Sequence, residues 1–212
     1  MPERSPQDYI AQIHTFTSIS MEMSTLLRTY VELLLHWNKK INLIGARQED
    51  KIWERHVIDC AQLVRHIPPG TGDLIDFGSG AGLPGIILAI MTNKQVHLIE
   101  SDKRKCAFLR EAASKLELKN VYIHAERIET IKPWPVEYIT ARALAPLHSL
   151  LELTNPFTHT KTSTFFLKGK TLEQEISDAK LNWDFHYEVF QSITDSHGSV
   201  ISIHSTHKRP KS

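Results

Sequence analysis

The fold of this chain is decided by the stretch Asp76-Phe77-Gly78-Ser79-Gly80-Ala81-Gly82-Leu83-Pro84-Gly85. It follows a short apolar run at 73–77, typical of a buried strand, and leads into a helix-like run at 84–91. Glycines let a backbone turn tightly and approach a ligand. Proline suits the first turn of a helix, where its missing N–H costs nothing. The stretch therefore predicts a strand, a ligand-binding turn and a helix.

A second acidic residue narrows the choice of ligand. Glu100 ends the next strand-like run, 96–99, where the ribose-binding carboxylate of a nucleotide-binding fold belongs. Leu83 stands where the dinucleotide pattern GxGxxG has its third glycine, and Asp76 would repel a pyrophosphate. Two carboxylates around a glycine turn suit a ligand that carries an ammonium and a ribose but no phosphate. We therefore predict S-adenosylmethionine, rather than a nicotinamide dinucleotide, bound at Asp76, Gly78, Gly80 and Glu100.

Strand-like and helix-like segments alternate beyond this stretch. We expect strands at 73–77, 96–99, 121–124, 138–141 and 164–167, with helices at 84–91 and 103–116 between them. This alternation predicts an α/β fold whose sheet is mostly parallel and covered on both faces. The closely spaced runs 185–190 and 199–204 predict an antiparallel hairpin at the end of the sheet.

The amino-terminal third has a helical pattern. Apolar residues recur at spacings of three and four between Leu26 and Ile41, which predicts an amphipathic helix, and a second helix is expected at 50–66. The first twenty residues are polar and expected to be loosely helical. Pro68-Pro69-Gly70 is the best candidate boundary. We expect a helical cap at 1–70, a catalytic domain at 71–206 and a disordered basic tail at 207–212.

Composition excludes several classes of protein. The 25 basic and 24 acidic residues nearly balance, so net charge does not identify a partner. The two cysteines form no ligand-spaced pair and the twelve histidines are scattered, so no metal site is expected. The longest apolar run is too short to cross a bilayer, and the first residues lack a signal-peptide pattern. We expect a cytoplasmic monomer.

Several further motifs make the resemblance of this chain specific. They are Trp37 to Leu43 (WNKKINL), Arg55 to Cys60 (RHVIDC), the glycine stretch, Leu98 to Leu109 (LIESDKRKCAFL), Leu118 to Val121, Arg127-Ile128-Glu129, Ala141-Arg142-Ala143 and Leu167-Lys168-Gly169. In this order the chain resembles the bacterial ribosomal RNA small-subunit methyltransferase G family, also called glucose-inhibited division protein B. The resemblance implies a class I S-adenosylmethionine-dependent methyltransferase, with a Rossmann-like sheet and an amino-terminal helical cap, that methylates guanine N7 in small-subunit ribosomal RNA.

The resemblance also implies roles for individual residues. It implies that Gly78 and Leu83 belong to the loop around the methionine part of the cofactor and that Glu100 binds the ribose. It further implies that Ile128 and Glu129 border the adenine and that Arg142 reaches the cofactor or the RNA. One residue departs from the family pattern, which has serine where this chain has Cys60. Because a thiol is a weak hydrogen-bond donor, any role that needs a hydroxyl at this position is in doubt.

The implied reaction needs little acid–base chemistry. Guanine N7 carries a free lone pair, so the enzyme needs positioning more than a strong base. We expect no catalytic acid or base and regard His56 and Arg142 as residues that position the substrate. Basic residues are expected to bind RNA phosphates at Lys39, Lys40, Arg47, Arg55 and Lys168. The alternatives are a methyltransferase for a small molecule or a protein, and a non-catalytic RNA-binding module.

Overall fold

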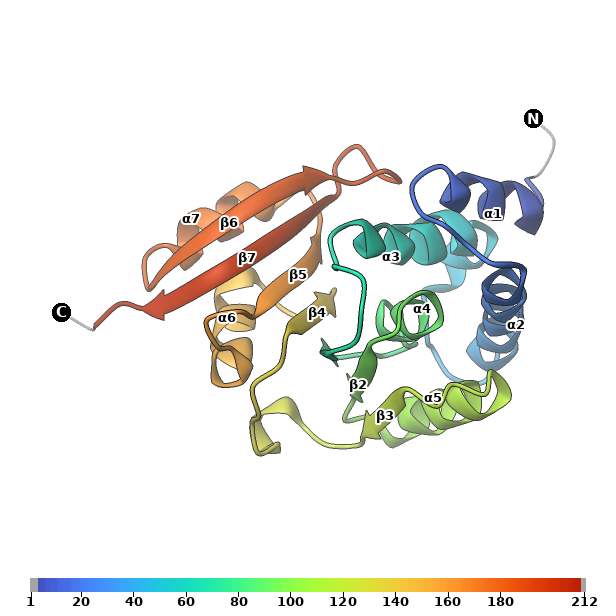
Figure 1. Ribbon diagram of the computed structural model, residues 1–212, viewed down its shortest axis with the longest axis horizontal. Coiled ribbons are helices and arrows are strands. Elements are labelled where there is room, and N and C mark those ends of the chain that lie inside the picture. The colour runs from blue at the N-terminus through green and yellow to red at the C-terminus, as the bar shows by residue number, and fades with distance from the viewer. Residues whose placement is uncertain (1–3, 211–212) are drawn as a thin grey trace.

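A computed structural model describes residues 4–210, without the side chains of residues 46 and 47 (Figure 1). Seven strands form one sheet in the order β3-β2-β1-β4-β5-β7-β6. The strands are β1 (Asp73–Phe77), β2 (Gln95–Ile99), β3 (Val121–His124), β4 (Tyr138–Arg142), β5 (Ser163–Lys168), β6 (Trp183–Gln191) and β7 (Ser199–Lys208). The first five strands run parallel, and β7 pairs antiparallel with both β5 and β6. The prediction of a mostly parallel sheet with a carboxyl-terminal hairpin is confirmed.

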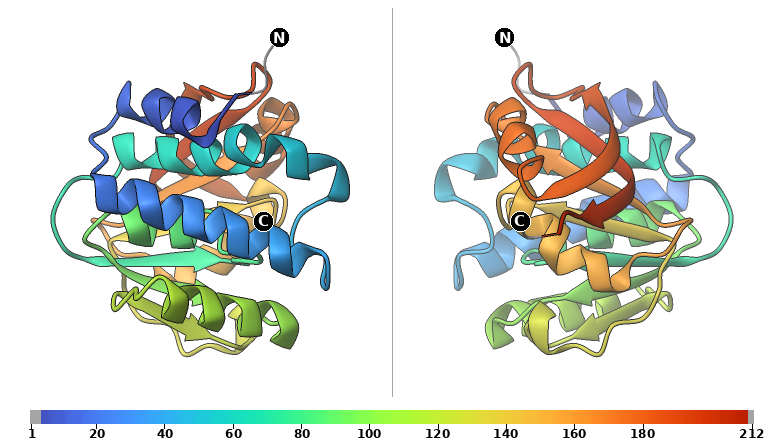
Figure 2. Two further views of the ribbon diagram at one scale, coloured as in Figure 1. Left: turned by 90° about the vertical axis from the view of Figure 1, so that its right-hand side faces the viewer. Right: turned by 90° about the vertical axis from the view of Figure 1, so that its left-hand side faces the viewer.

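Helices cover both faces of this sheet. The α-helices are α1 (Pro6–His14), α2 (Met21–Asn38), α3 (Asp59–Ala61), α4 (Gly85–Met91), α5 (Lys103–Lys115), α6 (Leu147–Thr154) and α7 (Leu172–Ala179). Short helical turns are η1 (Ala46–Lys51), η2 (Trp53–Ile58), η3 (Gln62–Arg65), η4 (Ile128–Thr130) and η5 (Asn155–Phe157). The amino-terminal helices stack on one side of the sheet, and the pair α6 and α7 lies on the other side (Figure 2).

Alternating side chains on the central strands build two hydrophobic cores. In β1, Leu74 packs with α2, α4 and α5, whereas its neighbours Ile75 and Phe77 pack with α6 and α7 on the opposite face. In β5 the same alternation places Phe165 and Phe166 in different cores. Successive side chains of a strand point to opposite faces, so a sheet with helices on both faces requires apolar residues at nearly every position.

Three local features differ from the predictions. The amino terminus forms a defined helix α1, because Ser5 and Asp8 make a capping box and Ile13 is fully buried. The helix expected at 50–66 is a run of 3-10, π and α turns, and its π turn η2 carries Arg55 and His56. Strand β7 extends through Lys208, so the disordered tail predicted to begin at residue 207 is part of the strand at residues 207 and 208. The pairing of Lys208 with Trp183 explains this extension.

The amino-terminal helices share a hydrophobic core with the sheet. Leu27 and Tyr30 of α2 belong to the same cluster of buried residues as Ile86 of α4 and Leu98 of β2. The Tyr30 hydroxyl also donates to the Ala81 carbonyl in the glycine stretch, at 2.6 Å. The cap therefore contributes directly to the position of the glycine loop, while its division from the sheet at residue 70 remains a prediction.

The order of the strands determines where a ligand can bind. The chain passes from β1 outward to β2 and β3, then returns to the other side of β1 with β4 and β5. In open α/β sheets, ligands bind at the carboxyl ends of the strands where this reversal occurs. Four predicted site residues, Gly78, Glu100, Arg142 and Lys168, end or follow β1, β2, β4 and β5.

Candidate active site

The first half of the site is a cavity of about 340 Å³ beside the glycine stretch, here called the glycine-loop cavity. Four of the predicted cofactor residues line it, namely Gly78, Glu100, Ile128 and Glu129. Ile99 and Leu153 add apolar surface to the same wall. The cavity thus combines a glycine turn, acidic groups and apolar walls at the carboxyl ends of β1 and β2.

Glu100 connects the second strand to the glycine turn. One carboxylate oxygen accepts the Gly80 N–H at 2.9 Å, and the other accepts the Asp102 N–H at 2.7 Å. Gly80 has a φ of +56°, a backbone conformation that side chains disfavour. A glycine at this position therefore lets the turn close onto Glu100. Each carboxylate oxygen has a further lone pair, which remains available for a ligand hydroxyl.

Asp76 lies beneath the glycine loop rather than facing the cavity. Its side chain is fully buried, and its oxygens accept the Gly85 N–H at 3.2 Å and the Thr140 hydroxyl at 3.0 Å. Burial raises the pKa of Asp76 to about 7, and hydrogen bonds from Ser79, Thr140 and Gly85 oppose the rise. The expectation that Asp76 meets the ligand's ammonium group therefore does not match its placement. The residue instead ties the loop to α4 and β4.

Leu83 and Gly80 also lie outside the lining of the glycine-loop cavity. Leu83 is buried in the hydrophobic core that the cap helices share with the sheet. The residues that remain at the cavity still fit S-adenosylmethionine. Glu100 offers acceptors for a sugar diol, Ile128 and Glu129 border a slot suited to a purine, and the volume falls within the usual range for small-ligand sites.

The second half of the site is a cavity of about 490 Å³ next to the first, here called the arginine cavity. Its lining includes His56, Asp59, Arg142, Lys168 and the turn between β6 and β7. The two cavities share Ala143, Leu144 and Ala145, so a single segment separates them. Arg142 therefore lies in the neighbouring cavity and does not line the glycine-loop cavity.

Arg142 is held by a set of contacts from the π turn η2 and from α3. Its guanidinium donates to the Arg55 carbonyl at 2.9 Å and lies 2.6 Å from His56 Nδ1. Its Nε lies 3.5 Å from Asp59 Oδ2. Cys60 Sγ accepts from the same guanidinium at 3.7 Å. Burial raises the pKa of Cys60 to about 12, so Cys60 is a neutral thiol against Arg142.

His56 is a neutral imidazole in this arrangement. Burial, then Arg142 and Arg55, lower its pKa to about 3. Since Nδ1 faces the guanidinium and must accept, the proton lies on Nε2. Nε2 is buried and has no hydrogen-bond partner among the described residues. The two predicted positioning residues are therefore in direct contact, and one of them retains an unsatisfied donor.

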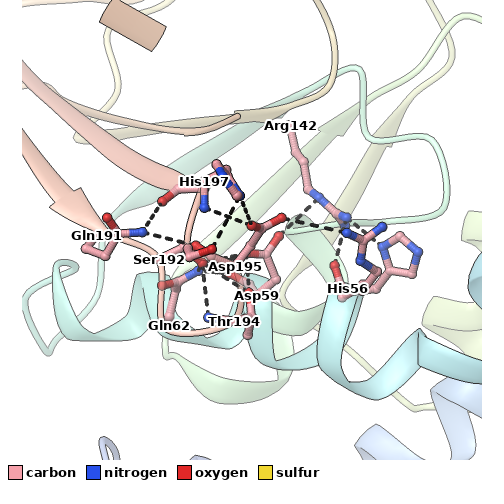
Figure 3. Close-up of polar contacts among 12 residues, drawn as sticks. His56, Asp59, Gln62, Arg142, Gln191, Ser192, Thr194, Asp195 and His197 are labelled. Atoms are coloured by element: carbon pink, nitrogen blue, oxygen red, sulfur yellow. Dashed lines mark hydrogen bonds and ion pairs between the residues drawn. The ribbon is translucent and has the colours of Figure 1, made fainter. Parts of the chain in front are cut away.

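The sequence interpretation missed the group that holds Arg142 from the other side. Asp59 accepts the Gln62 amide at 2.9 Å, the Thr194 hydroxyl at 3.0 Å and the Ser192 hydroxyl at 3.4 Å. Figure 3 shows Asp59 between Arg142 and the turn that carries Ser192 and Thr194. Burial raises the pKa of Asp59 and Arg142 opposes the rise. The separation of more than 130 positions between Gln62 and Ile193, which also bond, hid this network from sequence patterns.

The predicted RNA-binding residues fall into three groups. Lys39 and Lys40 are exposed at the end of α2, and Arg55 is exposed beside Asp195 at 3.7 Å. The side chain of Arg47 lies outside the described part of the structure. The placement of Lys168 does not match the prediction that it contacts an RNA phosphate. Its side chain is only 8% exposed and pairs with Glu175 at 2.6 Å, because β5 ends against α7.

Comparisons with known proteins agree with this geometry. Residues 23–204 match the family described as rRNA small subunit methyltransferase G. The chain is 44% identical to the ribosomal RNA small subunit methyltransferase G of Gluconobacter oxydans, over 88% of this chain and 96% of that protein. It is 38% identical to the protein of the same name from Rhodospirillum rubrum, over 96% and 99% of the two chains.

Solved structures resemble the fold at lower identity. A putative S-adenosyl-L-methionine-dependent methyltransferase from Methanococcus maripaludis superposes with a TM-score of 0.57 at 15% identity, over 78% of this chain and 94% of that one. A SAM-dependent methyltransferase from Aquifex aeolicus gives 0.57 at 17% identity, over 73% and 93%. The fold is that of the S-adenosylmethionine-dependent methyltransferases. Because the family model matches residues 23–204 and both relatives align over most of their length, the chain belongs to the rRNA small subunit methyltransferase G family.

Proposed function

We propose that this chain transfers a methyl group from S-adenosylmethionine to N7 of a guanosine in bacterial 16S ribosomal RNA. The observation that carries the proposal is the pair of adjoining cavities at the carboxyl edge of the sheet. The glycine-loop cavity fits the cofactor, and the arginine cavity offers the flipped base a place beside it. The names of the relatives support ribosomal RNA as the substrate.

The residues of the arginine cavity suit an attack that needs no base. Bound S-adenosylmethionine supplies an electrophilic methyl group, and guanine N7 has a lone pair in the neutral ring. His56 stays neutral and its Nδ1 accepts from Arg142, so it holds the guanidinium without adding a positive charge to the cavity wall. Asp59 lies beside Arg142 and balances its positive charge. The guanine ring therefore meets little repulsion from Arg142 as the ring itself becomes positively charged. The residues therefore hold and orient the base.

The cofactor half of the proposal predicts a large loss for Glu100→Ala. This change removes the acceptors of the Gly80 and Asp102 N–H groups and a proposed partner of the ribose. Hydrogen bonds to a charged group contribute roughly 1.5–3 kcal/mol each. We expect the affinity for S-adenosylhomocysteine in calorimetry to fall by at least about tenfold. Glu111→Ala, at an exposed position of α5, is the matched control. An unchanged dissociation constant would move the ribose contact elsewhere.

The RNA half of the proposal concerns the end of α2. Lys40 lines a small cavity together with Arg104 and Lys105, which follow the carboxyl end of β2. This placement puts basic side chains from two distant segments at the edge of the sheet that carries the site. Exposed lysines at such an edge suit RNA phosphates, whose contacts release counterions and make binding sensitive to salt.

Replacement of both Lys39 and Lys40 by alanine should weaken RNA binding and flatten its salt dependence. Each lost phosphate contact on a single strand lowers the slope of log affinity against log salt by roughly 0.7. We expect one to two lost contacts in filter binding across a salt series, with cofactor affinity unchanged. The control pair Lys115 and Lys119 is exposed at the opposite edge of the sheet. Equal salt slopes for the wild type and the Lys39/Lys40 variant would exclude this surface.

Two further parts of the proposal concern the state of the protein. We propose that it acts as a monomer in the cytoplasm, where its ribosomal RNA substrate is found. No helix among residues 4–210 has the length and apolar character needed to cross a bilayer. Light scattering coupled to size-exclusion chromatography tests the monomer, and a mass of twice 24.2 kDa would contradict it.

A further inference from the structure

One segment, Ala143–Leu147, separates the two cavities and is here called the partition segment. Ala143, Leu144 and Ala145 line both cavities. Leu144 lies directly over the glycine turn, since a Cβ added to Gly78 would be 2.6 Å from Leu144 Cδ1. Ala143 has a φ of +51°, which a residue other than glycine adopts only where its surroundings hold it. Contacts with neighbouring side chains must therefore hold this segment in its conformation.

Lys168 and Glu175 hold the partition segment through hydrogen bonds to its backbone. Lys168 Nζ donates to the Ala145 carbonyl at 2.7 Å and to Glu175 Oε2 at 2.6 Å. The same Glu175 oxygen accepts the Leu147 N–H at 2.9 Å. The two side chains thus bind the segment at its middle and at its carboxyl end, and both are mostly buried, at 8% and 18% exposed. Thr171 donates to the other Glu175 oxygen at 2.9 Å, which fixes the carboxylate.

We propose that Lys168 and Glu175 are positioning residues for methyl transfer, which act by fixing the partition segment between cofactor and base. The inference rests on the proposed function, in which the cofactor and the guanine occupy the two cavities. Leu144 then forms the wall that both reactants contact. A displacement of about 1 Å at a reacting pair can cost roughly 100-fold in rate. A buried pair that fixes this wall therefore affects the rate of transfer more than the binding of RNA.

The test compares Lys168→Met, Glu175→Gln and the exposed neighbour control Lys170→Met in steady-state methylation of small-subunit RNA. We expect both pair variants to lower kcat by about tenfold or more, with the KM for RNA and its salt dependence unchanged. The double variant should be little worse than either single variant, because each breaks the same ion pair between Lys168 and Glu175. Lys168→Arg keeps a donor for both oxygens and should restore much of the kcat.

Glu175→Gln separates this inference from an RNA contact at Lys168. If Lys168 bound a phosphate, loss of its partner's charge would free the lysine and strengthen RNA binding, while Lys168→Met would raise KM and flatten the salt slope. That pattern would overturn the inference, as would a wild-type kcat in both variants. Thermal melting checks folding. If Lys168→Met fails to fold, Glu175→Gln and Leu144→Ala, which removes the wall itself, decide by the same kcat criterion.

The failure of the proposed function gives a different result. A wild-type protein that binds S-adenosylhomocysteine but methylates no ribosomal RNA would contradict that function alone. The brace is then tested by cofactor binding, since Leu144 also lines the glycine-loop cavity. Weaker binding of S-adenosylhomocysteine by Glu175→Gln than by wild type would support the brace, and equal binding would contradict it.

Discussion

Arg142→Ala should lower kcat/KM for methylation of ribosomal RNA by about 100-fold or more. Arg142 is the point where η2, α3 and β4 meet, through the Arg55 carbonyl, His56 and Asp59. Its removal leaves Asp59 without its cation and frees His56 to change its position and tautomer. Arg142 does not line the glycine-loop cavity, so we expect no direct contact between Arg142 and the cofactor. The affinity for S-adenosylhomocysteine should therefore stay within about threefold of wild type.

Two variants sharpen this prediction. Arg142→Lys keeps the charge but has no planar fork of donors, so we expect it to recover only a small part of the activity. Arg65→Ala, at an exposed position of η3, is the control for loss of an arginine. Circular dichroism and thermal melting report folding, because the loss of one partner of a buried ion pair typically costs about 3–5 kcal/mol. A folded Arg142→Ala with wild-type kcat/KM would remove Arg142 from the substrate site.

The buried carboxyl group of Asp76 should give the apoprotein a distinctive dependence of stability on pH. Burial raises the pKa of Asp76 from 3.8 to about 7, so between these values the unfolded chain releases a proton that the folded chain retains. The unfolded state is favoured increasingly across this window. The contribution of Asp76 to stability is therefore greatest below about pH 4 and falls until about pH 7. At about 1.4 kcal/mol per pKa unit, the change is on the order of a few kcal/mol.

Asp76→Asn isolates this contribution. Asparagine resembles a protonated aspartic acid in shape and can accept from Gly85 and donate to Thr140. We expect the free energy of unfolding of the variant, relative to wild type, to increase as pH rises from 4 to 7 and then level off. Urea melts at several pH values measure the difference. A difference that stays constant over this range would show that Asp76 is ionised throughout.

His56 acts in the opposite direction and must be separated from Asp76. Its pKa is lowered from 6.5 to about 3, so its contribution to stability is present above pH 6.5 and is lost as pH falls toward 3. The wild-type profile sums both effects and can look flat. The comparison of wild type with Asp76→Asn removes the histidine contribution, because both proteins contain His56.

The sequence was most informative where function and local structure coincide. The run from Asp76 to Gly85 predicted β1, the glycine turn and α4, because a buried strand, left-handed glycines and a helix each leave a local pattern. The alternation of apolar runs likewise predicted the parallel sheet and its final hairpin. Bounds were less accurate at β6 and β7, where strand pairing extends each strand into polar sequence.

Other features depend on contacts between distant residues and leave no local pattern. Asp76 reads as a ligand-facing acid, and only the structure shows that it bonds with Gly85 and Thr140 beneath the loop. Lys168 reads as an exposed lysine in a basic segment, and its partner Glu175 becomes visible once α7 folds back on β5. Asp59 lies in the RHVIDC motif, but that motif does not reveal its pairing with Arg142 or its hydrogen bond from Thr194.

The most direct test of the central claim is methylation of bacterial small-subunit ribosomal RNA in vitro with labelled S-adenosylmethionine. Digestion to nucleosides and mass spectrometry identify the product. The expected product is labelled 7-methylguanosine at a single position, formed by wild type and strongly reduced in Arg142→Ala. Methyl transfer to another atom or to no RNA, by a protein that still binds S-adenosylhomocysteine, would contradict the assignment of the arginine cavity to guanine.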